Sequence, residues 1–150
     1  MNFEIYSELK ADPYFNQFDF ISEGHKGKIP KRILFTPTRW SNVYNLAFGD
    51  TKETGEIDDN KISDNGDRNK ILATVVKVVE MYTNKFPDRW VYFTGSTEHR
   101  TRLYRMAVTI HLKELSDMFE ICSEIKGRVG WVKFQKGLDI NAFLVKKKIY

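Results

Sequence analysis

One segment, NKILATVVKVVEMYTNKFP, constrains the fold of this chain more than any other. Its apolar residues recur at steps of three and four, which predicts an amphipathic helix over residues 68–86 that Asp67 caps and Pro87 ends. The β-branched valines lower the helix propensity, so this helix needs another element against which to pack. The next run, WVYF over Trp90–Phe93, has the apolar and aromatic character of a buried strand. We therefore predict that the helix packs on a sheet that contains the WVYF strand.

Segments on both sides of that helix have the composition of strands. Before it, the segments Phe18–Gly24, Lys31–Trp40 and Asn42–Asp50 are predicted to be antiparallel neighbours. After it, MFEICSEI, GWVKFQKG and AFLVKKKIY return to strand character and are separated by glycines. These patterns predict an α+β fold, with a single domain over residues 1–150, a mostly antiparallel sheet and two main helices.

Size and polarity limit the class of protein. The 150 residues, 41% of them hydrophobic, suffice for one globular core. No apolar run approaches the ~20 residues that cross a bilayer, and MNFEIYSELK at the start is too acidic and polar for a secretory signal. We therefore expect a soluble, cytoplasmic protein with no membrane partner. The single cysteine, Cys122, excludes an internal disulfide, and its apolar neighbours predict a small core residue.

The segment Thr51–Asp67 is almost without apolar residues and contains the turn dipeptide Asn65-Gly66. Its acidic residues lack the regular spacing and the terminal glutamate of a calcium loop. The three histidines of the chain show no metal-ligand spacing. We predict a solvated loop with room for a short hairpin, no metal site and no cofactor.

The net charge of +4 hides an asymmetry between the two parts of the chain. Residues 1–66 hold 8 Lys or Arg against 11 Asp or Glu, whereas residues 67–150 hold 16 against 9. The balance is therefore −3 in the first part and +7 in the second. Such an excess is compatible with nucleic acid or a phosphorylated ligand, and equally with a mixed solvated surface.

The stretch FTGSTEHRTRLYR, from Phe93 to Arg105, contains the most specific functional signal. A helix that begins at Ser96 or Thr97 would present unpaired N–H groups beyond the end of the WVYF strand, an arrangement that binds anions. A glycine there lets the backbone approach a ligand. The candidate anion-binding residues are Gly95, Ser96, Thr97, Arg100, Thr101, Arg102 and Tyr104.

Two alternatives stay open for this stretch. The arginines can be solvated or ion-paired, for example Arg102 with Glu98, which lies four residues before it. Residues 102–112 also alternate as a strand would, although the capping signal favours a helix. The stretch is neither a Walker sequence nor a GxGxxG fingerprint, so nucleotide binding is not specifically indicated.

The elements GSTEHRTRLYR and NAFLVKKK resemble the GST-x-x-RTRLY core and the AFLVK-like strand of a bacterial domain-of-unknown-function family. The resemblance covers most of the chain and makes the seven candidate residues the positions that match the family's core. It implies no reaction and no ligand. The chain has Glu98-His99 where such proteins commonly show a proline, which puts the helix start in doubt.

Three functions are compatible with these patterns. The first is binding of a phosphate-bearing ligand, most plausibly nucleic acid, because aromatic residues interleave with lysines near the end of the chain. These residues are Trp131, Lys133, Phe134, Lys136, Phe143, Lys146, Lys147 and Lys148. The second is a protein-interaction module of a bacterial operon pair. The third is a small RNA-cleaving hydrolase in which an arginine stabilises charge and a hydroxyl or a histidine transfers the proton. Ser96 and His99 lie three residues apart, within reach of each other at a helix start, but no acid is identified to orient the histidine, which is predicted to face solvent. Whether the chain is an enzyme stays open, because no complete catalytic motif is present.

Overall fold

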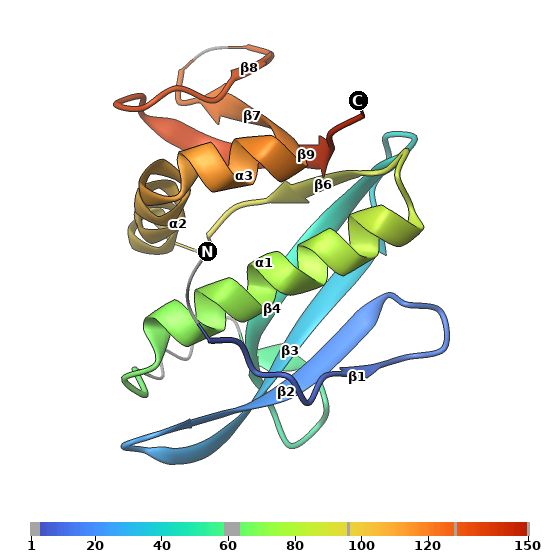
Figure 1. Ribbon diagram of the computed structural model, residues 1–150, viewed down its shortest axis with the longest axis vertical. Coiled ribbons are helices and arrows are strands. Elements are labelled where there is room, and N and C mark those ends of the chain that lie inside the picture. The colour runs from blue at the N-terminus through green and yellow to red at the C-terminus, as the bar shows by residue number, and fades with distance from the viewer. Residues whose placement is uncertain (1–3, 59–63, 96, 128, 150) are drawn as a thin grey trace. The chain divides into compact units, whose positions relative to one another are not determined.

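The computed structural model describes residues 4–58, 64–95, 97–127 and 129–149 (Figure 1). Its strands form a mostly antiparallel, nine-stranded sheet in the order β1-β2-β3-β4-β6-β9-β7-β8, with β5 paired to β4. Three helices accompany these strands. The predicted α+β fold is therefore confirmed. The chain divides into two compact units: unit 1 comprises Met1–Thr36 and Leu46–Tyr82, and unit 2 comprises Pro37–Asn45 and Thr83–Tyr150.

Unit 1 is an antiparallel hairpin with further strands and a helix. Its elements are β1 (Lys10–Ala11), β2 (Gln17–Gly24), β3 (Gly27–Pro37), the part of β4 (Val43–Thr51) from Leu46 onward, β5 (Ile57–Asp58) and most of α1 (Arg68–Lys85). The strands β2 and β3 pair antiparallel and turn at Gly27, whose φ of 91° favours glycine. The strands and the helix predicted for this region are confirmed.

The core of unit 1 lies between the hairpin and α1. Phe18, Phe35 and Tyr82 are fully buried or nearly so, and the rings of Phe35 and Tyr82 stack with their centroids 3.8 Å apart. Val78 and Val79 of α1 are also buried, as the periodicity of the helix predicts. The β-branched stripe of α1 is therefore stabilised by packing on strands.

Unit 2 contains a parallel pairing, between the start of β4 and β6 (Trp90–Phe93). Its other elements are α2 (Glu98–Ile110), α3 (Leu112–Met118), β7 (Phe119–Ile125), β8 (Trp131–Lys133) and β9 (Ile140–Lys147). The strands follow the order β4-β6-β9-β7-β8. Residues 98–110 are helical, so the strand alternative for this stretch is wrong, and the short helix α3 was not predicted.

The two helices of unit 2 pack on one face of its sheet, α2 on β9 and α3 on β7 (Figure 1). Val91, Ile121 and Val145 occupy one cross-strand row and are buried. Strand alternation places their sequence neighbours on the opposite face. Among the described residues, no helix combines the length and the apolar character that a membrane crossing requires.

Candidate functional site

The predicted junction between β6 and α2 is held together by its own hydrogen bonds. Thr97 is the N-cap of α2, and its Oγ1 accepts from the N–H of Arg100 at 3.2 Å. The Thr101 hydroxyl accepts from the N–H of Gly95 at 3.0 Å and donates to the carbonyl of Thr97 at 3.2 Å. A Cβ on Gly95 would lie 2.3 Å from the backbone nitrogen of Thr101. Gly95, Thr97 and Thr101 therefore all have a structural role at the start of the helix.

The arginines of the same stretch do not all share one environment. Arg100 lies near Tyr104; burial raises the pKa of the Tyr104 phenol, and the charge of Arg100 lowers it in part. Arg102 is exposed. Arg105 donates to the carbonyl of Leu138 at 3.2 Å, which ties it to the segment before β9. The structure thus groups Arg100 with Tyr104 and directs Arg105 to another partner.

Two expectations about this stretch concern its charged and nucleophilic residues. Glu98, expected to pair with Arg102, forms an ion pair with Lys126 at 3.1 Å. Ser96 and the side chain of His99, a pair that a helix start could bring within reach of each other, lie outside the described residues.

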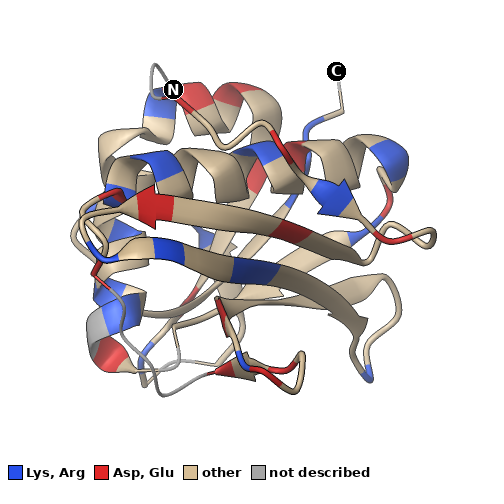
Figure 2. Cartoon of the chain, turned by 90° about the horizontal axis from the view of Figure 1, so that it is seen from below, with Lys and Arg blue, Asp and Glu red and all other residues tan. Residues whose placement is uncertain are grey.

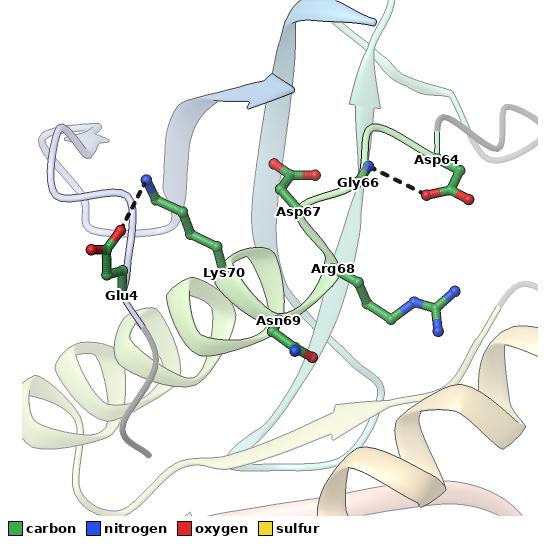
Figure 3. A pocket seen from close by; sticks show the side chains of 7 residues that line it. All are labelled: Glu4, Asp64, Gly66, Asp67, Arg68, Asn69 and Lys70. Carbon is green, nitrogen blue, oxygen red and sulfur yellow. Dashed lines mark hydrogen bonds and ion pairs between the residues drawn. The ribbon is translucent and has the colours of Figure 1, made fainter. Parts of the chain in front are cut away.

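A second candidate, which the sequence interpretation missed, is a pocket of about 540 Å³ at the N-terminus of α1 (Figure 3). It is lined by Glu4, Asp64, Gly66, Asp67, Arg68, Asn69 and Lys70. Carboxylates and cations mix in this lining, and Glu4 lies 3.9 Å from Lys70 (Figure 3). The pocket therefore has no excess of positive charge with which to select an anion.

The carboxylate of Asp67 does not cap α1, although α1 begins directly after it. Its Oδ2 accepts from the hydroxyls of Tyr6 and Ser22, and its Oδ1 is buried without a hydrogen-bond partner among the described residues. Asp67 does occupy the predicted N-cap position, since its carbonyl accepts from the N–H of Ile71 at 2.9 Å, but the hydroxyls of Tyr6 and Ser22 bind its carboxylate in place of the helix N–H groups. Burial, reinforced by Asp67, raises the pKa of Tyr6.

The predicted solvated loop Thr51–Asp67 is solvated only in part. Residues 57–58 form β5, as the predicted hairpin allows, and residues 59–63 lie outside the described part of the chain. Asn65 is buried; its amide donates to Ser22 Oγ at 3.1 Å and to the carbonyl of Gly27 at 3.0 Å. The end of the loop is therefore tied to the hairpin of β2 and β3.

A third candidate is the face of the unit 2 sheet opposite its helices. Tyr92, Leu144, Cys122 and Lys133 are successive cross-strand partners, so their side chains lie on this face. Alternation adds Trp90, Trp131 and Lys146. The rings of Tyr92 and Trp131 meet edge to face with centroids 5.9 Å apart, and Lys146 Nζ lies 5.5 Å from the centroid of Trp90. We call this surface, defined by Trp90, Tyr92 and Trp131, the aromatic face.

The aromatic face corrects three expectations. Phe134 and Phe143, candidates for stacking on bases, are buried core residues, and only Trp131 of that set is exposed, at 39%. Cys122, predicted to be in the core, is half-buried on the aromatic face because alternation turns it away from Phe119 and Ile121. Burial and then the charge of Glu120 raise the pKa of its thiol.

The charge asymmetry of the sequence coincides with the two units. Unit 2 carries 14 lysines and arginines against 7 aspartates and glutamates, whereas unit 1 carries 10 against 13. The formal net charge is therefore +7 for unit 2 and −3 for unit 1. Figure 2 shows these charges along the ribbon. The unit with the aromatic face is also the basic one.

Comparison with known proteins adds a family. The model of a family described as "Family of unknown function (DUF6934)" matches residues 2–148. No curated protein and no solved structure matches the chain.

Proposed function

The chain belongs to the family of unknown function DUF6934, and we propose that it binds nucleic acid through unit 2. The observation that carries this proposal is the coincidence, in one unit, of a charge of +7 and an aromatic sheet face on which Trp131 is exposed and Trp90 and Tyr92 are half-buried. The positive charge attracts phosphates, and aromatic rings are surfaces on which bases stack. The bacterial source of the family and its GST-x-x-RTRLY signature remain predictions from the sequence.

Unit 2 supports this function better than the pocket at α1 does. The pocket belongs to the acidic unit, and its lining contains three carboxylates and two cations. At the junction before α2, Thr97 and Thr101 already accept the N–H groups of Arg100 and Gly95. An anion-binding role for the junction stays a prediction, with Thr97 and Arg102 as exposed side chains that a phosphate could reach.

Salt-dependent binding to nucleic acid tests the proposal. Fluorescence anisotropy with labelled oligonucleotides of mixed sequence should show binding at low salt. The logarithm of the affinity should fall linearly with the logarithm of the salt concentration, by about 0.7 for each phosphate neutralised on a single strand. If there is no binding at low salt, or if the affinity is independent of salt, the proposal is wrong.

A pair of matched variants locates the binding in unit 2. Reversing two exposed lysines there, with Lys133→Glu and Lys136→Glu together, should weaken binding about tenfold or more and make the salt slope shallower. The control reverses two exposed lysines of unit 1, Lys26→Glu and Lys28→Glu. Equal losses from the two pairs would contradict the assignment to unit 2.

A protein partner is the second candidate function, and the exposed face of α2 favours it. Arg102, Met106 and Ile110 follow one another at steps of four, which places them on one side of the helix. Met106 is 50% and Ile110 72% exposed. Apolar residues with this spacing serve as anchors in helix-mediated contacts. A protein encoded next to this chain should bind the wild type, and Ile110→Ser should weaken that binding while leaving affinity for nucleic acid unchanged.

A further inference from the structure

We infer that the nucleic acid is a single strand whose bases stack on the aromatic face, with Trp131 as the principal platform. This inference rests on the proposed function and specifies its substrate class. Nucleic-acid-binding sheets in other proteins use the same physics, since aromatic side chains on neighbouring strands stack two or three unpaired bases. The observations that carry it are the exposure of Trp131, its contact with Tyr92 and the placement of the lysines.

Trp131 is accessible and at the same time held in place. The residue is 39% exposed, and its ring meets the ring of Tyr92 edge to face at 5.9 Å. An edge-to-face contact fixes the orientation of a ring, so less conformational entropy is lost when a base stacks on it. Tyr92 is only half-buried, which makes it a second platform.

The aromatic face is wide enough for more than one base. Tyr92 on β6, Leu144 on β9, Cys122 on β7 and Lys133 on β8 form one cross-strand row. Three spacings between neighbouring strands amount to about 14 Å. Trp90 lies two residues before Tyr92, roughly 7 Å along β6, and provides a third aromatic ring.

The charges on this face separate the path of the phosphates from that of the bases. Lys133 on β8 and Lys146 on β9 lie on either side of β7, which carries Glu120 and Glu124. Lys146, on the inner strand β9, is the cross-strand partner of Glu120, whereas Lys133, on β8 at the end of the strand order, is paired with Cys122. Phosphates are therefore attracted to the β8 side of the face and repelled from β7. Bases are uncharged and tolerate the β7 region, where carboxylates accept hydrogen bonds from exocyclic amino groups.

A duplex does not fit this arrangement. Its bases are stacked on one another, and only their edges are accessible in the grooves. Stacking on Trp131 or Tyr92 requires unpaired bases with a free ring face. The aromatic face therefore predicts a higher affinity for single strands than for duplexes of the same sequence. The positive charge of unit 2 alone would not produce this preference.

The test compares two exposed tryptophans that differ in position. Affinity for a labelled 12-nucleotide single strand of mixed sequence is measured for the wild type, Trp131→Ala, Trp131→Phe and Trp40→Ala. Trp40 is 60% exposed and lies in the segment between β3 and β4, away from the cross-strand rows of the aromatic face. Trp131→Ala should lose about 5- to 150-fold in affinity, the usual worth of one base stacked on an aromatic ring. Trp131→Phe should retain most of the affinity, and Trp40→Ala should lose less than about threefold.

The single cysteine supplies an independent readout in the wild-type chain. Cys122 lies on the aromatic face between Leu144 and Lys133, so a bound strand should cover its thiol. The rate of alkylation by a small maleimide should fall severalfold when the single strand is saturating, and should stay unchanged with the duplex at the same concentration.

The outcomes separate the two proposals. If no nucleic acid binds at low salt, the proposed function is wrong, and this inference is wrong with it. If single strand and duplex bind equally, Trp131→Ala behaves like Trp40→Ala and Cys122 is not protected, then unit 2 binds nucleic acid by charge alone. In that case the proposed function stands and the stacking site is refuted.

Discussion

Replacing Gly95 by alanine tests why a glycine lies between β6 and α2. The sequence suggests that it lets the backbone approach a ligand, whereas the structure packs it against the first turn of α2. The added Cβ would lie 2.3 Å from the backbone nitrogen of Thr101 and 2.6 Å from the carbonyl carbon of Arg100. These are backbone atoms, which a rotamer change cannot move.

The magnitude of the effect follows from the displacement that Gly95→Ala requires. The strand end and the helix must separate by roughly 1 Å to restore van der Waals distance. Overpacking of this kind costs about 1–3 kcal/mol. The same movement weakens the hydrogen bond of 3.0 Å from the Gly95 N–H to Thr101 Oγ1, at a net cost of about 0.5–1.5 kcal/mol. We expect a total loss of about 1.5–4.5 kcal/mol in the free energy of unfolding.

Urea unfolding followed by tryptophan fluorescence measures this loss, because all three tryptophans belong to unit 2. Two variants serve as controls. Gly137→Ala changes a glycine with φ of 83° and no neighbouring atom within 4 Å, so its cost of about 1–2 kcal/mol comes from the backbone conformation alone. Thr101→Val leaves the Gly95 N–H without its acceptor and should cost about 1–3 kcal/mol.

The double variant Gly95→Ala with Thr101→Val should lose less than the sum of the single variants, because both disrupt the same contact. A Gly95→Ala protein within about 0.5 kcal/mol of the wild type would refute the packing argument. The role of Gly95 would then have to be sought in ligand binding.

Three further predictions concern buried polar groups. The Ser123 hydroxyl is buried without a partner among the described residues, so Ser123→Ala should raise the free energy of unfolding by about 1 kcal/mol in urea titrations. Asp50→Ala removes the carboxylate of the buried ion pair with Lys31 and should cost about 3–5 kcal/mol, whereas Lys31→Met with Asp50→Leu should cost much less. Burial raises the pKa of Tyr104, so the wild type should lose stability as the pH rises through 10, the unfolded value, and Tyr104→Phe should lose less over pH 9–11.

Local patterns in the sequence determined most elements of the fold. The helix α1 and the hairpin of β2 and β3 were predicted because their side-chain periods, 3.6 and 2, repeat over several turns or pairs of residues. The strand β6 was predicted from the continuous apolar run WVYF between a proline and a glycine. The cap of α2 was narrowed to Ser96 or Thr97 because capping depends only on residues within one turn, and the structure shows that it is Thr97. The family of unknown function was also expected from the sequence.

The candidate sites depended on contacts that no local pattern contains. The sequence placed Asp67 before a helix, but Tyr6 and Ser22, distant along the chain, take its carboxylate away from the cap. Likewise, Glu98 lies one turn before Arg102 and yet forms an ion pair with Lys126. Each such choice is a competition between a local partner and a distant one, and only the assembled fold brings the distant partner near.

The aromatic face shows most clearly what the local sequence determined and what depended on the tertiary structure. Alternation in the sequence places Trp131 and Val132 on opposite faces of a strand, but it was not applied to Cys122, whose apolar neighbours wrongly predicted a core position. It did not indicate which of the two faces the helices cover, because a strand pattern is symmetric when both sides carry apolar or aromatic residues. Packing of α2 on β9 and α3 on β7 decided that question. This packing buried Phe143 and Ile121 and left Trp131 accessible. The strand itself determines on which face a side chain lies, but the elements that pack against that face determine whether the side chain is exposed.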